Sequence, residues 1–290
     1  MDGATEEEDF SGIPIKERLD HKVLRLRIFL LRSCAINRRS RSIHYLLQVW
    51  KARVSAYEEL AKKFRLADPA DAREFTQYDG CLKKMAVDAN AVAQESGLTT
   101  LINYVENAPN AARTRETVIP AVVEKCFGST RAGTKAKALE LILMYIEIDV
   151  ADPVVVSGTA CYFYVTSTAL WFKPLFEFIL PGLDAKQPKL VAQTVLTLKE
   201  ITVSPKPILK HLAKIFGHVD KNVRTEATAL TMEVHRWLGA ALSSYLSELK
   251  PVQVKELEEG FAKLPADKPV AARLLRSQVA AAVDAEQGND

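Results

Sequence analysis

The sequence lacks the features that mark membrane and secreted proteins. It has no stretch of about 18 uninterrupted apolar residues, so a transmembrane helix is not expected. Its first ten residues, MDGATEEEDF, are acidic, whereas a secretory signal has a basic start and a longer apolar run. These absences predict an intracellular protein.

Residues that bind metals or form disulfides are also few. None of the four cysteines belongs to a CxxC pair, and the five histidines show no metal-ligand spacing. No Ser-His-Asp or Cys-His set can be placed. The segment GSTRAGTK, residues 128–135, only approaches a phosphate-binding loop, because threonine precedes its lysine and no strand leads into it. We therefore expect reduced thiols, no cofactor and no enzymatic activity.

Strand signals are nearly absent, and apolar residues at helical spacing run through the chain instead. Ala56, Tyr57, Leu60 and Phe64 make one such stripe. The stripes form six helix–turn–helix units, with first helices that begin near residues 13, 73, 115, 174, 206 and 241. The turns within the units fall near Trp50, Asn90, Arg131, Gln187, Asn222 and Val252. This repeat predicts an all-α fold, an α-solenoid of six HEAT-type helix pairs.

Two segments interrupt the repeat. Residues 23–48 hold six arginines and no acidic residue, and residues 156–173 are aromatic, rich in threonine and nearly uncharged. Without the second segment, the longest distance between turns falls from 56 to 38 residues, in line with the others. Introns begin with GT and end with AG in the gene, and the first and last codons of both segments can match these ends. Our hypothesis is that both are translated introns, and the alternative is that they are genuine insertions.

The net charge depends on these segments. The formal net charge is +3, but the segments carry +6 and +1, so the remainder has a charge of −4. A nucleic-acid-binding interpretation based on overall basicity thus rests on the two segments alone. The arginine run also starts too late, behind an acidic leader, for a transit peptide or a membrane-binding helix. We expect neither nucleic acid nor membrane as a partner.

In a stacked array of helix pairs, the turns within the pairs line one long edge. We call the residues of these turns the binding ridge. It comprises Trp50, Lys51, Arg53, Asn90, Arg131, Lys135, Lys186, Gln187, Lys189, Lys221, Asn222 and Arg224. Arginine and tryptophan are favoured anchors of protein interfaces, and positive charge steers an acidic partner. The ridge predicts that the chain binds an acidic protein surface.

Structural interpretations of the same residues stay open at this point. Lysine and arginine at helix starts are often only solvated, and an arginine such as Arg224 can bond neighbouring turns. Trp50 can cover the edge of the core rather than face a partner.

Several longer motifs resemble one family. The stretches VWKARVSAYEELAKKF, DANAVAQESGLTTLINYVENAP, TRAGTKAKALELILMYIEID and DKNVRTEATALTMEVHRWLG are similar to the first TOG domain of the Dis1/TOG microtubule polymerase family, with fungal members the most similar. The likeness spans residues 12–280 outside the two segments. Residues 1–11 and 281–290 read as a disordered acidic leader and a disordered tail.

The resemblance implies a flat paddle of HEAT repeats that grips a curved αβ-tubulin dimer through its turns and supports growth at microtubule plus ends. It implies a place on microtubules in the cytoplasm, at spindle poles and kinetochores. By motif, Trp50 takes the role of the family's first-turn tryptophan and Arg224 that of its fifth-turn arginine. A general HEAT scaffold for another acidic partner is the alternative. Weaker tubulin binding by Trp50→Ala and Arg224→Ala would separate the two.

Overall fold

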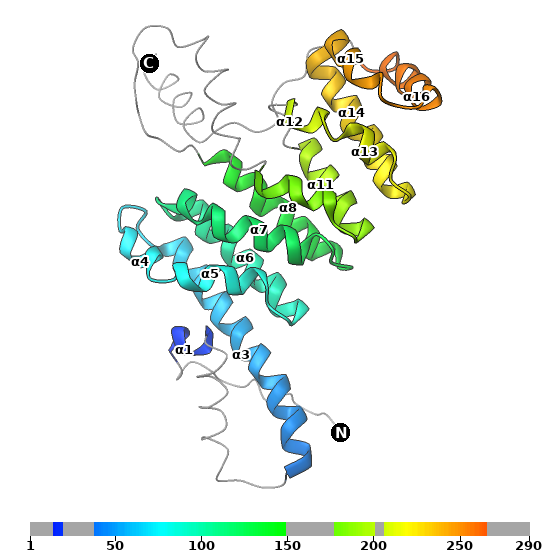
Figure 1. The fold of residues 1–290 in the computed structure, drawn as a ribbon. Helices are drawn as coiled ribbons and strands as arrows, with labels where there is room; N and C mark the ends of the chain where they lie inside the picture. Colours follow the sequence, from blue (N-terminus) through cyan, green and yellow to red (C-terminus); the bar gives the residue numbers. More distant parts are fainter. Residues whose placement is uncertain (1–13, 20–37, 149–176, 201–205, 266–290) are drawn as a thin grey trace, which may run out of the picture. The chain divides into compact units, whose positions relative to one another are not determined.

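The computed structural model describes residues 14–19, 38–148, 177–200 and 206–265 (Figure 1). Every regular element in these ranges is helical, as the spacing of apolar residues predicts. The chain divides into two compact units, residues 1–110 and 111–290. The segment 156–173 lies outside the described residues, and so do residues 23–37 of the other segment.

Unit 1 is built around one long helix. Its elements are α1 (Ile15–Leu19), α3 (Arg38–Leu66), α4 (Ala72–Thr76), α5 (Asp79–Ala86) and α6 (Ala91–Asn107). Helix α6 packs along α3 and against α5, and α1 packs on α3. The predicted stripe of α3 faces this core, and its Phe64 ring contacts the rings of Phe75, Tyr78 and Tyr104. Burial of this stripe is what holds the helices together.

Helices α5 and α6 approach closely at Gly97. A Cβ atom on Gly97 would lie 2.7 Å from the carbonyl oxygen of Met85. Only glycine therefore allows the two backbones this separation.

The structure corrects the prediction of a turn near Trp50. Trp50 lies inside α3, which runs without a break for 29 residues. The sequence from Arg38 to Leu66 contains no proline or glycine, so nothing in it stops a helix from extending through Trp50. Residues 38–48, which belong to the segment suspected of being an intron product, are part of this same helix.

Unit 2 continues the helical pattern. Its elements are η1 (Ala111–Thr114), α7 (Arg115–Cys126), α8 (Ala132–Glu147), η2 (Leu180–Asp184), α11 (Pro188–Glu200), α12 (Lys206–Leu209), α13 (Leu212–Phe216), α14 (Lys221–Leu238), η3 (Gly239–Leu242), α15 (Ser243–Leu246) and α16 (Pro251–Phe261). Helix α7 packs on α8, α11 on α14, and α14 on α13 and α16. The N-terminal ends of α8, α11 and α14 lie on one side of the unit (Figure 1). Within the described residues, no helix is long and apolar enough to span a membrane.

Five of the predicted turns agree with the structure. Asn90 and Arg131 are the residues that precede the first turns of α6 and α8. Gln187 precedes α11, while Asn222 and Val252 are second residues of α14 and α16. The turns were predictable because capping residues and proline mark helix starts locally.

Candidate protein-binding surface

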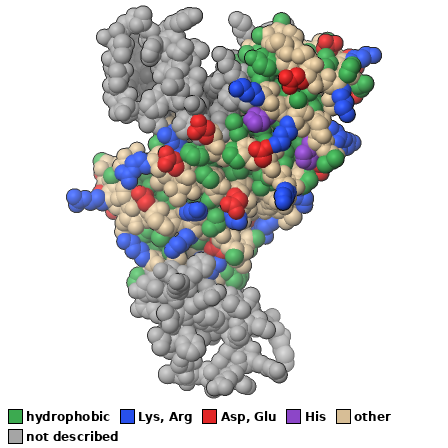
Figure 2. Space-filling view, viewed as in Figure 1, with side chains coloured by type: hydrophobic (Ala, Val, Ile, Leu, Met, Phe, Trp, Pro, Cys, Tyr) green, Lys and Arg blue, Asp and Glu red, His purple; other side chains and the backbone are tan. Residues whose placement is uncertain are grey.

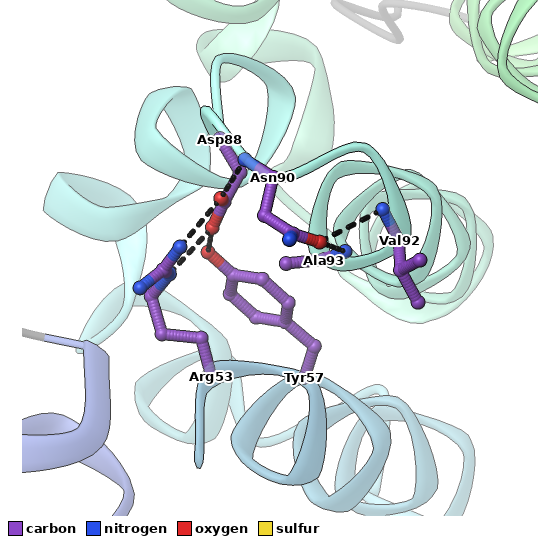
Figure 3. Close-up of polar contacts among 6 residues, drawn as sticks. All are labelled: Arg53, Tyr57, Asp88, Asn90, Val92 and Ala93. Atoms are coloured by element: carbon purple, nitrogen blue, oxygen red, sulfur yellow. Dashed lines mark hydrogen bonds and ion pairs between the residues drawn. The ribbon is translucent and has the colours of Figure 1, made fainter. Parts of the chain in front are cut away.

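A buried ion pair joins α3 to the turn between α5 and α6 (Figure 3). Arg53 donates hydrogen bonds from Nε and Nη2 to the two carboxylate oxygens of Asp88, each 2.7 Å long. The hydroxyl of Tyr57 donates a third bond of 3.0 Å to the same carboxylate. The Arg53 and Asp88 side chains are only 5% and 0% exposed, so each buried charge depends on the other. The prediction that Arg53 lies on the ridge is wrong, because its side chain is buried and holds the turn between α5 and α6 through Asp88.

The ion pair shifts the pKa of its members. Burial alone raises the pKa of Asp88, but hydrogen bonds from Arg53 and the Asn90 N–H, with the charge of Arg53, outweigh it and hold this pKa below its ordinary value. Burial lowers the pKa of Arg53, and its bonds with Asp88 more than reverse this, so the pKa rises. Burial, and then the charge of Asp88, raises the pKa of Tyr57. At neutral pH the cluster therefore holds a carboxylate, a guanidinium and a neutral phenol.

Asn90 caps helix α6 directly above this pair. Its side-chain oxygen accepts hydrogen bonds from the N–H groups of Val92 and Ala93, at 3.0 and 3.1 Å (Figure 3). Its own N–H donates to Asp88, at 2.9 Å. The predicted binding residue Asn90 is thus also a helix cap, and its position is set by the buried pair.

Trp50 lies one helical turn before Arg53 of the ion pair, and Lys51 follows Trp50. Trp50 precedes Arg53 by three residues, so the two side chains share one face of α3. That face meets the turn that carries Asn90, since Arg53 bonds to Asp88. Trp50 is half-buried and Lys51 is exposed. Unit 1 thus brings Trp50 and Asn90 to one side of α3, although Trp50 lies in a helix rather than in a turn.

In unit 2, three turns that are far apart in the sequence surround one groove. Its volume is about 370 Å³, and it is lined by Lys135 of α8, Lys189 of α11 and Asn222 of α14. Ser129 and Thr130 of the turn before α8 complete the side nearest Lys135. Three of the predicted ridge residues therefore lie around a single concave surface, as a shared edge of stacked helix pairs requires.

The groove carries charge of both signs. Lys135 is half-buried and Lys189 is exposed, and neither forms an ion pair with another described residue. Asp220 and Glu226 lie on the side of α14. The Asp220 carboxylate accepts a 2.7 Å hydrogen bond from the Asn222 N–H and so caps α14. Basic and acidic side chains are also mixed over the described part of the face shown in Figure 2.

Gln187 and Arg131 belong to neighbouring turns of the same groove. Gln187 donates a long 3.5 Å hydrogen bond to the Gly128 carbonyl, and its amide occupies the space that a Cβ on Gly128 would need. Gln187 therefore ties the turn before α11 to the turn before α8. Arg131 is exposed, and its N–H donates to the Ser129 hydroxyl.

The Arg224 side chain hydrogen-bonds to the turn that precedes α14. Its Nη1 donates to the carbonyl oxygens of His218 and Val219, at 2.7 and 2.8 Å. The sequence alone allowed either a bond to turns or a contact with a partner, and the structure shows bonds to the preceding turn. This side chain is half-buried.

The Asp88 cluster was missed by sequence reasoning, and one signal could have found part of it. Arg53 sits beside Ala52 and Ala56 on the apolar stripe, where a charged residue needs a partner. Its partner is 35 residues away, however, and helical spacing does not identify it. In the part of the chain that the structure describes, no cluster of His, Cys, Asp or Glu is arranged to hold a metal ion.

Comparison with known proteins identifies the family of this arrangement. The family model described as XMAP215/Dis1/CLASP, TOG domain, matches residues 44–163 and 159–261. Protein mini spindles of Drosophila melanogaster is 34% identical over 280 residues, which cover 94% of this chain and 11% of that protein. The spindle pole body component alp14 of Schizosaccharomyces pombe is 32% identical over 286 residues, which cover 94% of this chain and 30% of that protein.

A solved structure shares the fold as well as the sequence. This structure comes from work on the structural basis of tubulin recruitment and assembly by microtubule polymerases with TOG domain arrays. It matches with a TM-score of 0.68 and 30% identity, over 82% of this chain and 49% of that one. The match to Protein mini spindles and to alp14 covers less than a third of the length of each of these two relatives.

Proposed function

The chain belongs to the XMAP215/Dis1/CLASP family of TOG domains, and from this premise we propose that it is a non-enzymatic module that binds the αβ-tubulin dimer through its turns. The observation that carries the proposal is the groove of unit 2, where Lys135, Lys189 and Asn222 come together from three successive turns. The proposed surface also includes Arg131 and Gln187 beside the groove.

In unit 1, the proposed surface consists of Trp50, Lys51 and Asn90. The half-buried indole offers apolar area, and the exposed Lys51 offers charge beside it. Aromatic side chains of this kind supply much of the binding free energy of protein interfaces. The buried Arg53–Asp88 pair fixes the turn that carries Asn90, so the surface is formed before the partner arrives.

The lysines supply the electrostatic part of the proposed binding. Two cations without an ion-pair partner in the described chain can meet carboxylates of an acidic partner without first breaking an internal pair. Such charges mainly raise the association rate and fix orientation, and their effect weakens as salt increases.

We further propose that the module prefers free, curved tubulin to the straight tubulin of the microtubule wall. A module that binds curved tubulin more tightly than straight tubulin releases the dimer when the dimer straightens in the microtubule wall. This release requires only a difference in affinity between the two states of tubulin. The names of the two relatives refer to spindles and to the spindle pole body. We therefore propose a place on cytoplasmic microtubules, with growth promotion as the activity of a longer protein that contains this module.

Binding of purified αβ-tubulin tests the proposal. The double variant Lys135→Glu/Lys189→Glu should weaken the complex at least about tenfold at low ionic strength, with a smaller effect in high salt, because it turns attraction into repulsion. Lys62→Glu/Arg65→Glu is the matched control, since it makes the same charge change at exposed positions near the end of α3. Analytical ultracentrifugation gives the dissociation constants.

Each result separates the alternatives. Equal losses in both double variants would mean that overall charge, not the groove, drives binding. If the unmodified chain does not bind tubulin at all, the proposed function is wrong and the general HEAT scaffold replaces it. Comparing free dimers with stabilised microtubules in a pelleting assay tests the preference for curved tubulin, and equal affinity for both would contradict it.

A further inference from the structure

The groove of unit 2 contains a buried amide side chain that the sequence analysis did not consider. Gln193 of α11 is only 8% exposed, and it lines the groove together with Lys189 and Leu196 of the same helix. These positions are four and three residues apart, so they lie on one face of α11. Lys189 is exposed at the start of the helix and Leu196 is half-buried. Gln193 is therefore the buried polar residue on the floor of the groove.

The side-chain amide of Gln193 has no hydrogen-bond partner among the described residues. What stays exposed of this side chain faces the groove that it lines. The two other buried amides of the described residues, Gln94 and Asn103, each donate to a backbone carbonyl, at 2.9 and 2.8 Å. Native proteins rarely leave a buried polar group unpaired, because its desolvation is not compensated. The exception at Gln193 points to a group that enters the groove from another molecule.

The chemistry of the amide indicates which kind of group this is. Its nitrogen donates hydrogen bonds and its oxygen accepts them, so full pairing needs a ligand that both accepts and donates. A carboxylate only accepts, and it would leave the Gln193 oxygen without a donor. The C=O and N–H of one residue in an extended main chain point to the same side and can pair with both atoms of the amide. A peptide main chain therefore fits Gln193 better than an acidic side chain does.

The walls of the groove carry charges that would orient such a peptide. Helix α11 packs against both α8 and α14, so Gln193 lies between the wall that holds Lys135 and the wall that holds Asp220 and Glu226. An acidic side chain of the peptide would turn towards Lys135 and Lys189 and away from the two carboxylates. The volume of about 370 Å³ is in the range of ligand-binding pockets in proteins.

We propose that Gln193 is the floor contact of this groove and pairs with the main chain of an extended acidic loop of the αβ-tubulin dimer. This rests on the proposed tubulin-binding function, and it adds a contact residue that does not belong to the binding ridge. The lysines attract the loop and orient its acidic side chain, whereas the amide selects an extended main chain. Because the amide is unpaired in the free chain and paired in the complex, the pairing adds to the affinity.

The first test replaces the amide by an apolar side chain of similar size. Gln193→Leu should weaken tubulin binding at least about tenfold, because a main-chain group of tubulin is then buried without its partner. The thermal unfolding midpoint of the free chain should stay the same or rise, because the variant no longer buries an unpaired amide. Asn103→Leu is the matched control, since it removes an amide of similar burial outside the groove and should leave binding unchanged. Analytical ultracentrifugation gives the dissociation constants.

The second test separates main-chain pairing from charge. The amide and a peptide group are both neutral, so the loss from Gln193→Leu should be the same in low and high salt, unlike the loss from Lys135→Glu/Lys189→Glu. In high salt, Gln193→Lys should also weaken binding, since an ammonium group donates but cannot accept. Stronger binding by Gln193→Lys in high salt would mean that a carboxylate occupies the floor, and it would overturn the main-chain pairing.

The outcomes distinguish this inference from the proposed function. Unchanged binding by Gln193→Leu, with binding by the unmodified chain, would overturn the inference and leave the function standing. A fall in the unfolding midpoint of Gln193→Leu larger than that of Asn103→Leu would show that the amide is already paired in the free chain, and would also overturn the inference alone. Absence of tubulin binding by the unmodified chain would overturn both.

Discussion

The buried ion pair of unit 1 makes the sharpest prediction about stability. Asp88→Ala would leave the guanidinium of Arg53 buried without its counter-charge and the Tyr57 hydroxyl without its acceptor. Removing one partner of a buried pair costs about 3–5 kcal/mol. The free energy of unfolding of a whole domain is only about 5–15 kcal/mol. The single substitution should therefore remove a large part of the stability of unit 1.

Urea unfolding followed by circular dichroism measures this loss. With a slope of about 1–3 kcal/mol per molar urea, the midpoint for Asp88→Ala should fall by at least about 1 M. Hydrogen exchange should show the loss in α3 and α6, the helices that the pair connects, more than in α11 or α14. Unchanged exchange in α3 and α6 would contradict the assigned role of the pair.

The double variant Arg53→Met/Asp88→Leu tests whether the cost of an unpaired buried charge explains the loss of stability. It replaces both charges with apolar side chains, so no uncompensated charge stays in the core. By the desolvation argument it should be much more stable than Asp88→Ala, although it lacks the same ion pair. If the double variant is as unstable as the single one, the attraction within the pair, and not the cost of an unpaired charge, explains the loss.

The same pair predicts how stability changes with pH. The pKa of Asp88 is lower in the folded chain than its ordinary value of 3.8. The carboxylate therefore contributes its full stabilisation above pH 3.8, and the contribution is lost as pH falls through the folded pKa. The difference in unfolding free energy between the unmodified chain and Asp88→Asn should narrow below about pH 4. A constant difference from pH 7 to pH 3 would show that the charge of Asp88 is not responsible.

Three further predictions concern single sites. Asn90→Ala should lower stability by about 1 kcal/mol through loss of the α6 cap, as measured by the urea midpoint. Gly97→Ala should be destabilising by about 1–3 kcal/mol despite alanine's higher helix propensity, because its Cβ meets the Met85 backbone 2.7 Å away; a stabilised variant would contradict the close approach. Burial raises the pKa of Cys126 to about 12, so thiol reagents at pH 8 should label the half-buried Cys81 before Cys126, as peptide mapping would show.

The sequence by itself determined the local elements. Helical stripes such as Ala56, Tyr57 and Leu60 depend only on residues three or four positions apart, and all three are buried as expected. Asn90 caps its helix through N–H groups within three residues. Most turns could be located for the same reason, and the longer motifs resemble the family that the family model matches.

Only the tertiary structure decided how the charged and aromatic residues are used. Arg53 and Arg224 both read as surface cations, yet one is buried against Asp88 and the other bonds its own turn. Trp50 reads as a turn residue but lies in α3, because no residue there stops the helix. The partner of a charged side chain depends on distances between segments that are far apart in the sequence, and periodicity within one helix carries no information about those distances.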